Sequence, residues 1–138
     1  MTRSHRIIAL AVLGLALLAA CGAAPTSTAP AAVANPATMS VAELKQKLDA
    51  GTTMLLLDVR TPEEYSGDGH VAGSVLIPLQ ELEGRLGELP TDKPIACICR
   101  SGNRSAQACA LLAQRGFTNL TNVEGGMIAW KAAGYPAE

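Results

Sequence analysis

Hydrophobic and polar positions alternate in blocks from residue 39 onward and predict strands separated by helices. Short apolar runs bounded by glycine, proline or polar residues predict strands near residues 54–59, 74–77, 95–98 and 120–123. Apolar positions at helical spacing predict helices over residues 41–48, 104–115 and 126–133, and a weak helix over 82–89 that Gly84 and Gly87 interrupt. The run at 54–59 is nearly continuous, as expected of a parallel strand covered on both faces. The pattern therefore predicts the α/β class, a small parallel sheet with helices on both faces.

Two capping boxes mark helix starts in this part of the chain. Ser40 lies three residues before Glu43, and Thr61 lies three residues before Glu64. In each pair the hydroxyl and the carboxylate can satisfy backbone N–H groups that a helix start leaves unpaired. Pro62 then occupies the first helical position, where its missing N–H costs little. A short helix is therefore predicted directly after Thr61.

The start of the chain has the pattern of an export signal. A basic segment with Arg3 and Arg6 precedes an uninterrupted apolar run over positions 7–20. Such a run is long enough for the core of a signal peptide and too short for a comfortable membrane span. Its end, Leu-Ala-Ala-Cys21, resembles the lipobox of bacterial lipoproteins. Residues 1–20 are therefore predicted to be a lipoprotein signal peptide. An ordinary secretory signal with an incidental cysteine is the alternative.

The lipobox resemblance implies that Cys21 is acylated and becomes the mature N-terminus. Stable attachment to a membrane then needs more than one acyl chain. Residues 21–38 are rich in alanine and interrupted by prolines, so they are predicted to be the lipidated cysteine and a flexible linker. Residues 39–138 are predicted to form the folded domain. The expected location is the extracytoplasmic or periplasmic face of a bacterial cell envelope, with inner and outer membrane both left open.

The charge balance narrows the classes of partner. The chain has 11 basic and 12 acidic side chains, and two of the basic ones, Arg3 and Arg6, belong to the predicted signal peptide. No basic cluster argues for nucleic acid, and no run of charge argues for a helix on a membrane surface. The protein is therefore expected to bind no nucleic acid. A monomer is the default expectation, because no pattern in the sequence indicates an oligomer.

The stretch from residue 97 to residue 105 carries the strongest chemical signal. It reads Cys-Ile-Cys-Arg-Ser-Gly-Asn-Arg-Ser and joins a predicted strand to a predicted helix. The thiol of Cys99 would lie in a ring of backbone N–H groups ahead of a helix N-terminus, which binds anions and favours thiolate over thiol. Arg100 and Arg104 add permanent positive charge, and Gly102 lets the backbone N–H groups converge. The sequence predicts a nucleophilic cysteine that receives an anionic substrate.

The length of this loop separates two reaction classes. Cysteine-based phosphatases use a related cradle, C-x5-R, which is wide enough for a tetrahedral phosphate. Here the spacing from Cys99 to Arg104 is C-x4-R. The tighter ring suits a single sulfur atom carried on the cysteine. Sulfur transfer is therefore favoured, and a small cysteine phosphatase or arsenate reductase is the weaker alternative.

The loop resembles the active-site loop of rhodanese-homology sulfurtransferases, and three further motifs agree in order. They are Asp58-Val-Arg60-Thr-Pro-Glu-Glu64-Tyr65, then Gly69-His70-Val-Ala-Gly73-Ser74 with Ile77-Pro78, then Gly116-Phe117 with Val123-Glu-Gly125-Gly126-Met-Ile-Ala-Trp130. The resemblance covers about residues 39–138. One departure is visible, since three residues separate Tyr65 from Gly69 where many members have two.

The resemblance implies a two-step sulfurtransferase without a cofactor. The Cys99 thiolate takes sulfane sulfur from a thiosulfate-like or persulfide donor, and the resulting persulfide passes it to a thiol or to cyanide. The expected substrate-binding residues are Arg100, Ser101, Gly102, Asn103, Arg104 and Ser105. Arg100 is expected to point outward, toward the donor. Asp58, Arg60 and Glu64 are expected to support the site, with Asp58 or Glu64 as the ionic partner of Arg104.

The remaining cysteines and the histidines are interpreted as structural. Cys97 and Cys99 would lie about 6.6 Å apart along a strand, so a disulfide between them would be strained. Cys97 is interpreted as a buried small hydrophobe, with a role as resolving thiol or sulfur acceptor as the alternative. Cys109 is assigned to the core. No metal site is expected, because there is no second cysteine pair and His70 is the only histidine after the predicted signal.

A function of another class also fits the resemblance. A rhodanese-like domain without catalysis could serve as a protein-binding module. The presence of Cys99 in an intact loop favours the enzyme over this module.

Overall fold

The computed structural model describes residues 36–138. The predicted signal peptide, Cys21 and most of the predicted linker lie outside the described residues. Within the described part, no helix is long and apolar enough to cross a membrane.

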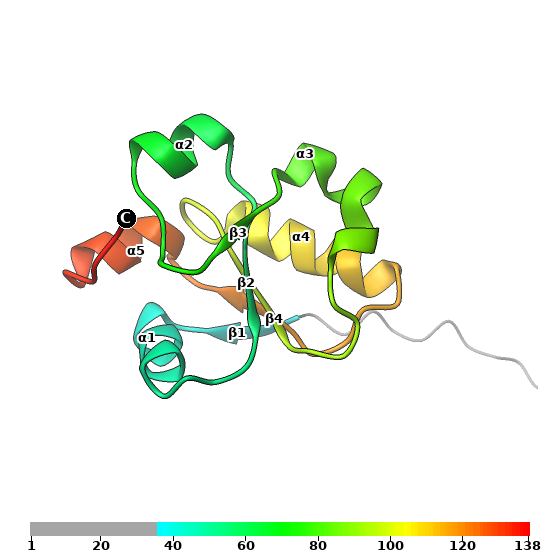
Figure 1. The fold of residues 1–138 in the computed structure, drawn as a ribbon, viewed down its shortest axis with the longest axis horizontal. Helices are drawn as coiled ribbons and strands as arrows, with labels where there is room; N and C mark the ends of the chain where they lie inside the picture. Colours follow the sequence, from blue (N-terminus) through cyan, green and yellow to red (C-terminus); the bar gives the residue numbers. More distant parts are fainter. Residues whose placement is uncertain (1–35) are drawn as a thin grey trace, which may run out of the picture. The chain divides into compact units, whose positions relative to one another are not determined.

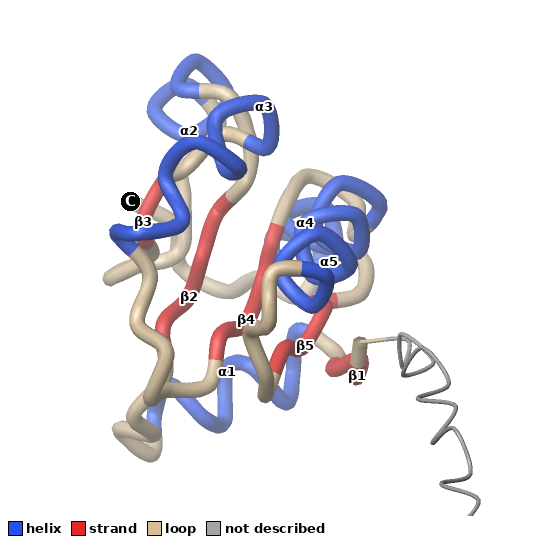
Figure 2. The backbone as a smooth tube through the Cα atoms, turned by 90° about the vertical axis from the view of Figure 1, so that its right-hand side faces the viewer, coloured by secondary structure: helices blue, strands red, loops and turns tan. Residues whose placement is uncertain are grey.

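The centre of the domain is a five-stranded sheet in which every neighbouring pair is parallel. Its strands are β1 (Ala37–Met39), β2 (Leu55–Asp58), β3 (Val75–Leu76), β4 (Ile95–Ile98) and β5 (Leu120–Val123). They lie in the order β1-β5-β4-β2-β3, which Figure 2 shows from right to left. The two central strands, β4 and β2, consist of apolar residues up to Asp58, because both of their faces are covered.

Helices cover both faces of this sheet, which confirms the predicted fold class. The helical elements are α1 (Val41–Asp49), α2 (Pro62–Gly67), α3 (Leu79–Leu82), the 3-10 helix η1 (Glu83–Glu88), α4 (Asn103–Gln114) and α5 (Gly126–Ala132). On one face, α3, η1 and α4 bury Leu57, Cys97 and Leu112 in one cluster. On the other face, α1 and α5 bury Leu44 and Trp130 in a second cluster. Figure 1 shows the two groups of helices on opposite sides of the strands.

The predicted helix starts agree with the structure. In the first capping box, Glu43 N–H donates to Ser40 Oγ at 3.2 Å, and Ser40 N–H donates to Glu43 Oε2 at 2.7 Å. The Thr61 and Glu64 pair repeats this arrangement at 3.3 and 3.1 Å. The weak helix predicted over 82–89 corresponds to the end of α3 and to η1, and Arg85 inside η1 is non-helical. Gly84 and Gly87 weaken the helix here, as predicted.

The first strand begins before residue 39, where the domain was predicted to start. Residues 37 and 38 belong to the predicted linker, but the structure places them in β1, paired with β5. Ala37 and Thr38 are exposed, and only Met39 is buried. A strand at the sheet edge that forms mainly backbone hydrogen bonds leaves almost no hydrophobic pattern, so the sequence could not reveal it.

All five strands point the same way, so their carboxyl ends meet at one edge. Asp58 ends β2 and Cys99 directly follows β4 at this edge. Ligands of open α/β sheets bind beyond the carboxyl ends of the strands. The fold therefore brings the predicted nucleophile and its predicted supporting residues to the edge where a site is expected.

Candidate active site

Cys99 lies at the start of the short loop between β4 and α4. Its side chain is 1% exposed. Gly102 caps α4 with a φ of 99°, in the left-handed region where a side chain is strained. A Cβ at Gly102 would also approach the Gly125 nitrogen to 3.2 Å. Glycine is therefore required here both for the turn and for the close approach of the neighbouring chain.

Hydrogen-bond donors surround the sulfur of Cys99. Gly102 N–H donates to Cys99 Sγ at 3.1 Å, and the Ser105 hydroxyl lies 3.4 Å from the same sulfur. Ser105 Oγ is also 3.0 Å from the Gly102 carbonyl oxygen, so its single proton can serve either acceptor. Burial alone would raise the pKa of Cys99. The hydrogen bonds from the Ser105 hydroxyl and from backbone N–H groups of Ser105, Ser101 and Gly102 outweigh burial and lower that pKa.

The N-terminus of α5 holds the start of the loop in place. Met127 N–H donates to the Cys99 carbonyl oxygen at 2.8 Å, and Ile128 N–H donates to the Arg100 carbonyl oxygen at 3.0 Å. These N–H groups have no partner inside their own helix, so the loop satisfies them. Gly126 has a φ of 53°, and a Cβ there would lie 2.8 Å from Arg100 O and would also collide with Cys99 O. This helix therefore fixes the peptide that carries the nucleophile.

Arg104 braces the loop against α2. Its guanidinium donates two hydrogen bonds to the Glu64 carboxylate, at 2.6 and 2.7 Å. The hydrogen bonds from Arg104 are the largest cause that lowers the pKa of Glu64 to about 2. Of the two predicted partners of Arg104, the structure thus has Glu64 and not Asp58.

Asp58 is occupied by another arginine. Arg60 and Asp58, 1% and 0% exposed, form a bidentate ion pair with distances from 2.7 to 3.0 Å. Arg60 also donates to the carbonyl oxygens of Glu64 at 3.1 Å and Gly69 at 3.0 Å. A buried charge pair is stable only when its remaining donors are satisfied as well. Arg60 therefore joins the end of β2 to α2 and to the turn after it.

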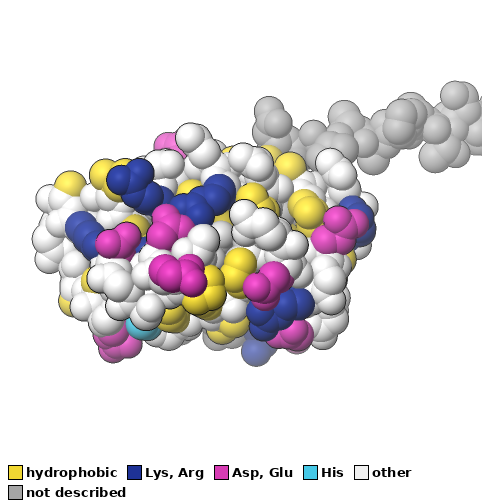
Figure 3. Space-filling view, turned by 90° about the horizontal axis from the view of Figure 1, so that it is seen from above, with side chains coloured by type: hydrophobic (Ala, Val, Ile, Leu, Met, Phe, Trp, Pro, Cys, Tyr) yellow, Lys and Arg dark blue, Asp and Glu magenta, His cyan; other side chains and the backbone are white. Residues whose placement is uncertain are grey.

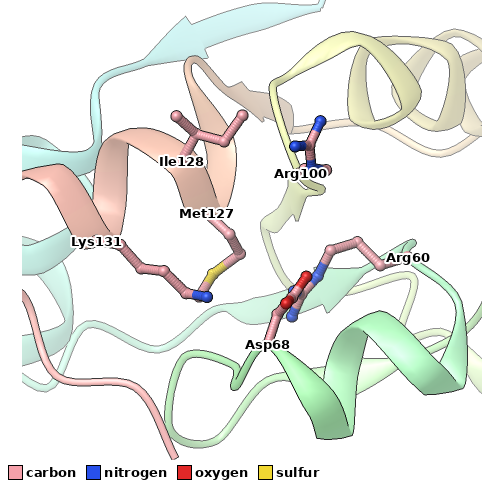
Figure 4. A pocket seen from close by; sticks show the side chains of 6 residues that line it. All are labelled: Arg60, Asp68, Arg100, Met127, Ile128 and Lys131. Atoms are coloured by element: carbon pink, nitrogen blue, oxygen red, sulfur yellow. The ribbon is translucent and has the colours of Figure 1, made fainter.

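The remaining loop side chains are exposed. Ser101 and Asn103 point to the surface, and Arg100 lies at the rim of a cavity of about 180 Å³. The other residues that line this cavity are Arg60, Asp68, Met127, Ile128 and Lys131 (Figure 4). Figure 3 shows the molecule from above, where basic and acidic side chains lie beside one another among hydrophobic ones. The outward position of Arg100 agrees with its expected orientation.

The other two cysteines of the domain are buried thiols. Cys97 and Cys109 are both 0% exposed and not disulfide-bonded. A hydrogen bond with Cys109, together with burial, raises the pKa of Cys97 well above its usual value. Such a thiol is a poor nucleophile at neutral pH, which agrees with the interpretation as core. Within residues 36–138, no three His, Cys, Asp or Glu side chains lie together as metal ligands would.

Sequence reasoning missed the cavity that adjoins the loop. Lys131 and Asp68 are both distant from Arg100 along the chain, one after it and one before it, and no spacing rule connects them. Trp130 is buried in the core, as its apolar character predicts. Because Trp130 faces the core, the helical spacing predicts that its neighbour Lys131 faces solvent. The spacing does not predict that Lys131 lies near the loop after Cys99. Only the packing of α5 on the peptide of Cys99 brings it there.

Comparison with known proteins supports the resemblance. A sulfurtransferase of Allochromatium vinosum is 40% identical over 93 residues, 67% of this chain and 86% of that protein. A putative sulfurtransferase of Bacillus subtilis, YtwF, is 39% identical over 98 residues, 71% of this chain and 93% of that protein. The crystal structure of a rhodanese-related protein from Thermoplasma volcanium superposes with a TM-score of 0.67 at 39% identity, covering 74% of this chain and 97% of that one.

The family assignment follows from the extent of these matches. Residues 40–133 match the rhodanese-like domain as a family, from the first capping box to the end of α5. They include every residue placed around Cys99 above. The chain therefore belongs to the rhodanese-like domain family.

Proposed function

We propose that the protein is a sulfurtransferase that carries sulfane sulfur as a persulfide on Cys99. The names of its relatives support a sulfurtransferase or sulfur-carrier role. The observation that carries the proposal is the set of hydrogen-bond donors around Cys99 Sγ, because they stabilise negative charge on a buried sulfur.

In the first step, the Cys99 thiolate attacks the outer sulfur of a thiosulfate-like donor. A bond forms between Cys99 Sγ and that sulfur, and the bond from that sulfur to the sulfite group breaks. Sulfite leaves with the electron pair, and the negative charge stays on the terminal sulfur of the new persulfide. Arg100 is exposed at the rim and attracts the donor anion.

In the second step, a nucleophile takes the terminal sulfur. A thiolate, or cyanide in an assay, attacks it and breaks its bond to Cys99 Sγ. The products are an acceptor persulfide, or thiocyanate, and the Cys99 thiolate, so the cycle needs no other oxidant or reductant. The Gly102 N–H group and the Ser105 hydroxyl hold the thiolate that is regenerated.

Transfer of sulfur from thiosulfate to cyanide by residues 22–138 tests the proposal. The Cys99→Ser variant should lose the activity entirely, whereas the Cys109→Ser variant should keep most of it if it folds. Intact mass after incubation with thiosulfate alone should show one added sulfur atom, absent from Cys99→Ser. A folded, reduced protein that takes up no sulfur would point instead to a non-catalytic binding module.

We also propose that the domain is exported and held at a membrane by acylated Cys21. The support is the apolar run at 7–20 and the lipobox-like end of that run. Expression of the full chain in bacteria, with labelled palmitate, should label the wild type and not Cys21→Ala. A wild type that stays unlabelled and soluble would overturn this part of the proposal.

A further inference from the structure

Three charged side chains surround the cavity next to the loop. Arg100, Lys131 and Asp68 are exposed at its rim, over a floor that contains buried Arg60 and Met127. Among residues 36–138, no ion pair includes Arg100, Lys131 or Asp68. The charge of Arg60 is already balanced by Asp58. Within the described domain, the cavity therefore offers two unpaired cations and one unpaired carboxylate.

This cavity is fixed to the nucleophile through the backbone. Its α5 wall contains Met127 and Ile128, whose N–H groups donate to the carbonyl oxygens of Cys99 and Arg100 at 2.8 and 3.0 Å. Its opposite wall is Asp68 at the end of α2 (Figure 4). The cavity therefore adjoins the peptide between Cys99 and Arg100, whereas Cys99 itself is not among the residues that line it.

The pattern of charge selects the kind of molecule. A small dianionic donor would be attracted by Arg100 and Lys131 and repelled by Asp68. A molecule with one carboxylate and one ammonium group would find a partner for both of its charges. Its methylene groups could lie against Met127 and against Ile128, which is 50% exposed. The volume of about 180 Å³ is below the roughly 300 Å³ of pockets for drug-sized ligands, so an amino-acid-sized molecule fits.

We propose that this cavity is the acceptor subsite and binds the carboxylate and ammonium groups of a zwitterionic amino-acid thiol, such as cysteine. Lys131 binds the carboxylate, and Asp68 binds the ammonium group. The thiolate of the acceptor attacks the terminal sulfur on Cys99, the bond from that sulfur to Cys99 Sγ breaks, and an acceptor persulfide leaves. The inference rests on the proposed function, because it names the acceptor of that reaction.

Acceptors that differ by one charged group test the assignment. The series is cysteine, 3-mercaptopropionate without the ammonium group, cysteamine without the carboxylate, and neutral 2-mercaptoethanol. For each acceptor, the KM of a variant is divided by that of the wild type, which cancels differences in thiol reactivity. Lys131→Met should raise KM about tenfold for cysteine and 3-mercaptopropionate only, and Asp68→Asn should do so for cysteine and cysteamine only.

Matched controls lie at the opposite edge of the sheet. Lys93 and Asp92 are exposed in the loop before β4. Lys93→Met and Asp92→Asn carry the same changes of charge and should leave every ratio near one. Equal ratios for all four acceptors in Lys131→Met or Asp68→Asn would overturn the proposal. A raised KM for thiosulfate in Lys131→Met, with the acceptor ratios near one, would assign the cavity to the donor instead.

A binding experiment separates this inference from the proposed function. S-Methylcysteine has both charged groups but no thiol, so it can bind and cannot react. Its titration into the 15N-labelled protein should shift the amide resonances of Ile128 and Lys131 saturably, with affinity about tenfold lower in Lys131→Met. Absence of saturable shifts, with transfer to cyanide intact, would overturn the acceptor subsite alone. Saturable binding without sulfur transfer would overturn the proposed function and with it the acceptor role, and would leave only a binding site for amino acids.

Discussion

The reactivity of Cys99 depends on opposing effects on one sulfur atom. Burial disfavours the thiolate, whereas hydrogen bonds from Ser105 and from three backbone N–H groups favour it. The backbone donors are fixed by the turn at Gly102. The Ser105 hydroxyl is the one donor that a substitution can remove without altering the backbone, so it can be tested by itself.

Ser105→Ala should raise the pKa of Cys99. Loss of a hydrogen bond to a charged group costs about 1.5 kcal/mol, which corresponds to about one pH unit. The wild-type thiolate forms as pH rises through a pKa below the usual value, and the variant should need a higher pH. The rate of iodoacetamide alkylation, measured against pH, gives both midpoints. Ser66→Ala, whose hydroxyl bonds to Pro62 within α2, serves as the control. An unchanged midpoint in Ser105→Ala would show that the backbone N–H groups alone lower the pKa of Cys99.

At this scale the sequence identifies residues whose role depends on local chain geometry. Cys99 could be predicted because its loop places backbone donors within a few residues. The Arg104 pairing could be narrowed to two acids but not decided, because only the fold shows that Arg60 occupies Asp58. Lys131 and Asp68 gave no signal, since their proximity depends on tertiary packing alone.

Among the secondary-structure elements, α5 has the clearest effect on the site. It contributes no side chain to the ring around the sulfur, yet its first N–H groups bind the Cys99 and Arg100 carbonyls. Gly126 makes this approach feasible, because any Cβ there would collide with the loop backbone. The glycine pair at 125–126 could be noted in the sequence as a family motif, but its purpose is visible only in the packing.

Gly126→Ala should destabilise the domain far more than the same change at Gly134. Both glycines have positive φ, 53° and 72°, so each alanine has a backbone strain of about 1 kcal/mol. Gly134 has open space around a Cβ, whereas Gly126 does not. We expect a loss of about 3 kcal/mol for Gly126→Ala and about 1 kcal/mol for Gly134→Ala. Urea unfolding measures both losses. Equal losses would show that the close packing of α5 on the loop backbone at Gly126 does not stabilise the domain.

The link between α4 and α2 should make stability depend on pH. Glu64 has a folded pKa of about 2, held low by Arg104, against a reference near 4.3 in an unfolded chain. The contribution of Glu64 to the free energy of unfolding is fully present above the pKa of the unfolded chain. It is lost as the pH falls toward the pKa of the folded protein. The pair is partly exposed, so we expect about 1 kcal/mol.

Glu64→Gln isolates this charge, because glutamine can still complete the capping box with Thr61. The variant should be less stable than the wild type at pH 7, and the difference should shrink between about pH 4.3 and pH 2. Free energies of unfolding at several pH values measure it. Glu124→Gln, at an exposed position whose side chain forms no hydrogen bond or ion pair within residues 36–138, controls for the loss of one carboxylate. A difference that stays constant down to pH 2 would rule out the charge as its cause.

For the whole molecule, the sequence predicts the class of fold but not the order of the strands. Alternating strands and helices require a parallel sheet, and the apolar runs identify its centre. The chain then places its first strand, β1, at the edge beside its last, β5. This pairing depends on backbone hydrogen bonds between the two ends of the domain sequence, which no local pattern reveals. The same limit explains why no local pattern marks residues 37 and 38 as part of a strand.

The contribution of β1 can be measured by shortening the chain. A chain that begins at residue 36 keeps β1, and one that begins at Ser40 removes β1 but keeps the N-cap of α1. The shorter chain loses the hydrogen bond from Glu124 N–H to the Met39 carbonyl oxygen and the burial of Met39. It also leaves the edge of β5 without a neighbouring strand.

Burial of one methionine stabilises by about 1.5–3 kcal/mol, and an uncovered edge strand promotes association. We therefore expect the chain from Ser40 to be about 2–4 kcal/mol less stable and to self-associate in sedimentation experiments. Equal stability of the two chains would mean that the domain begins at Ser40 after all, with β1 contributing nothing to its fold.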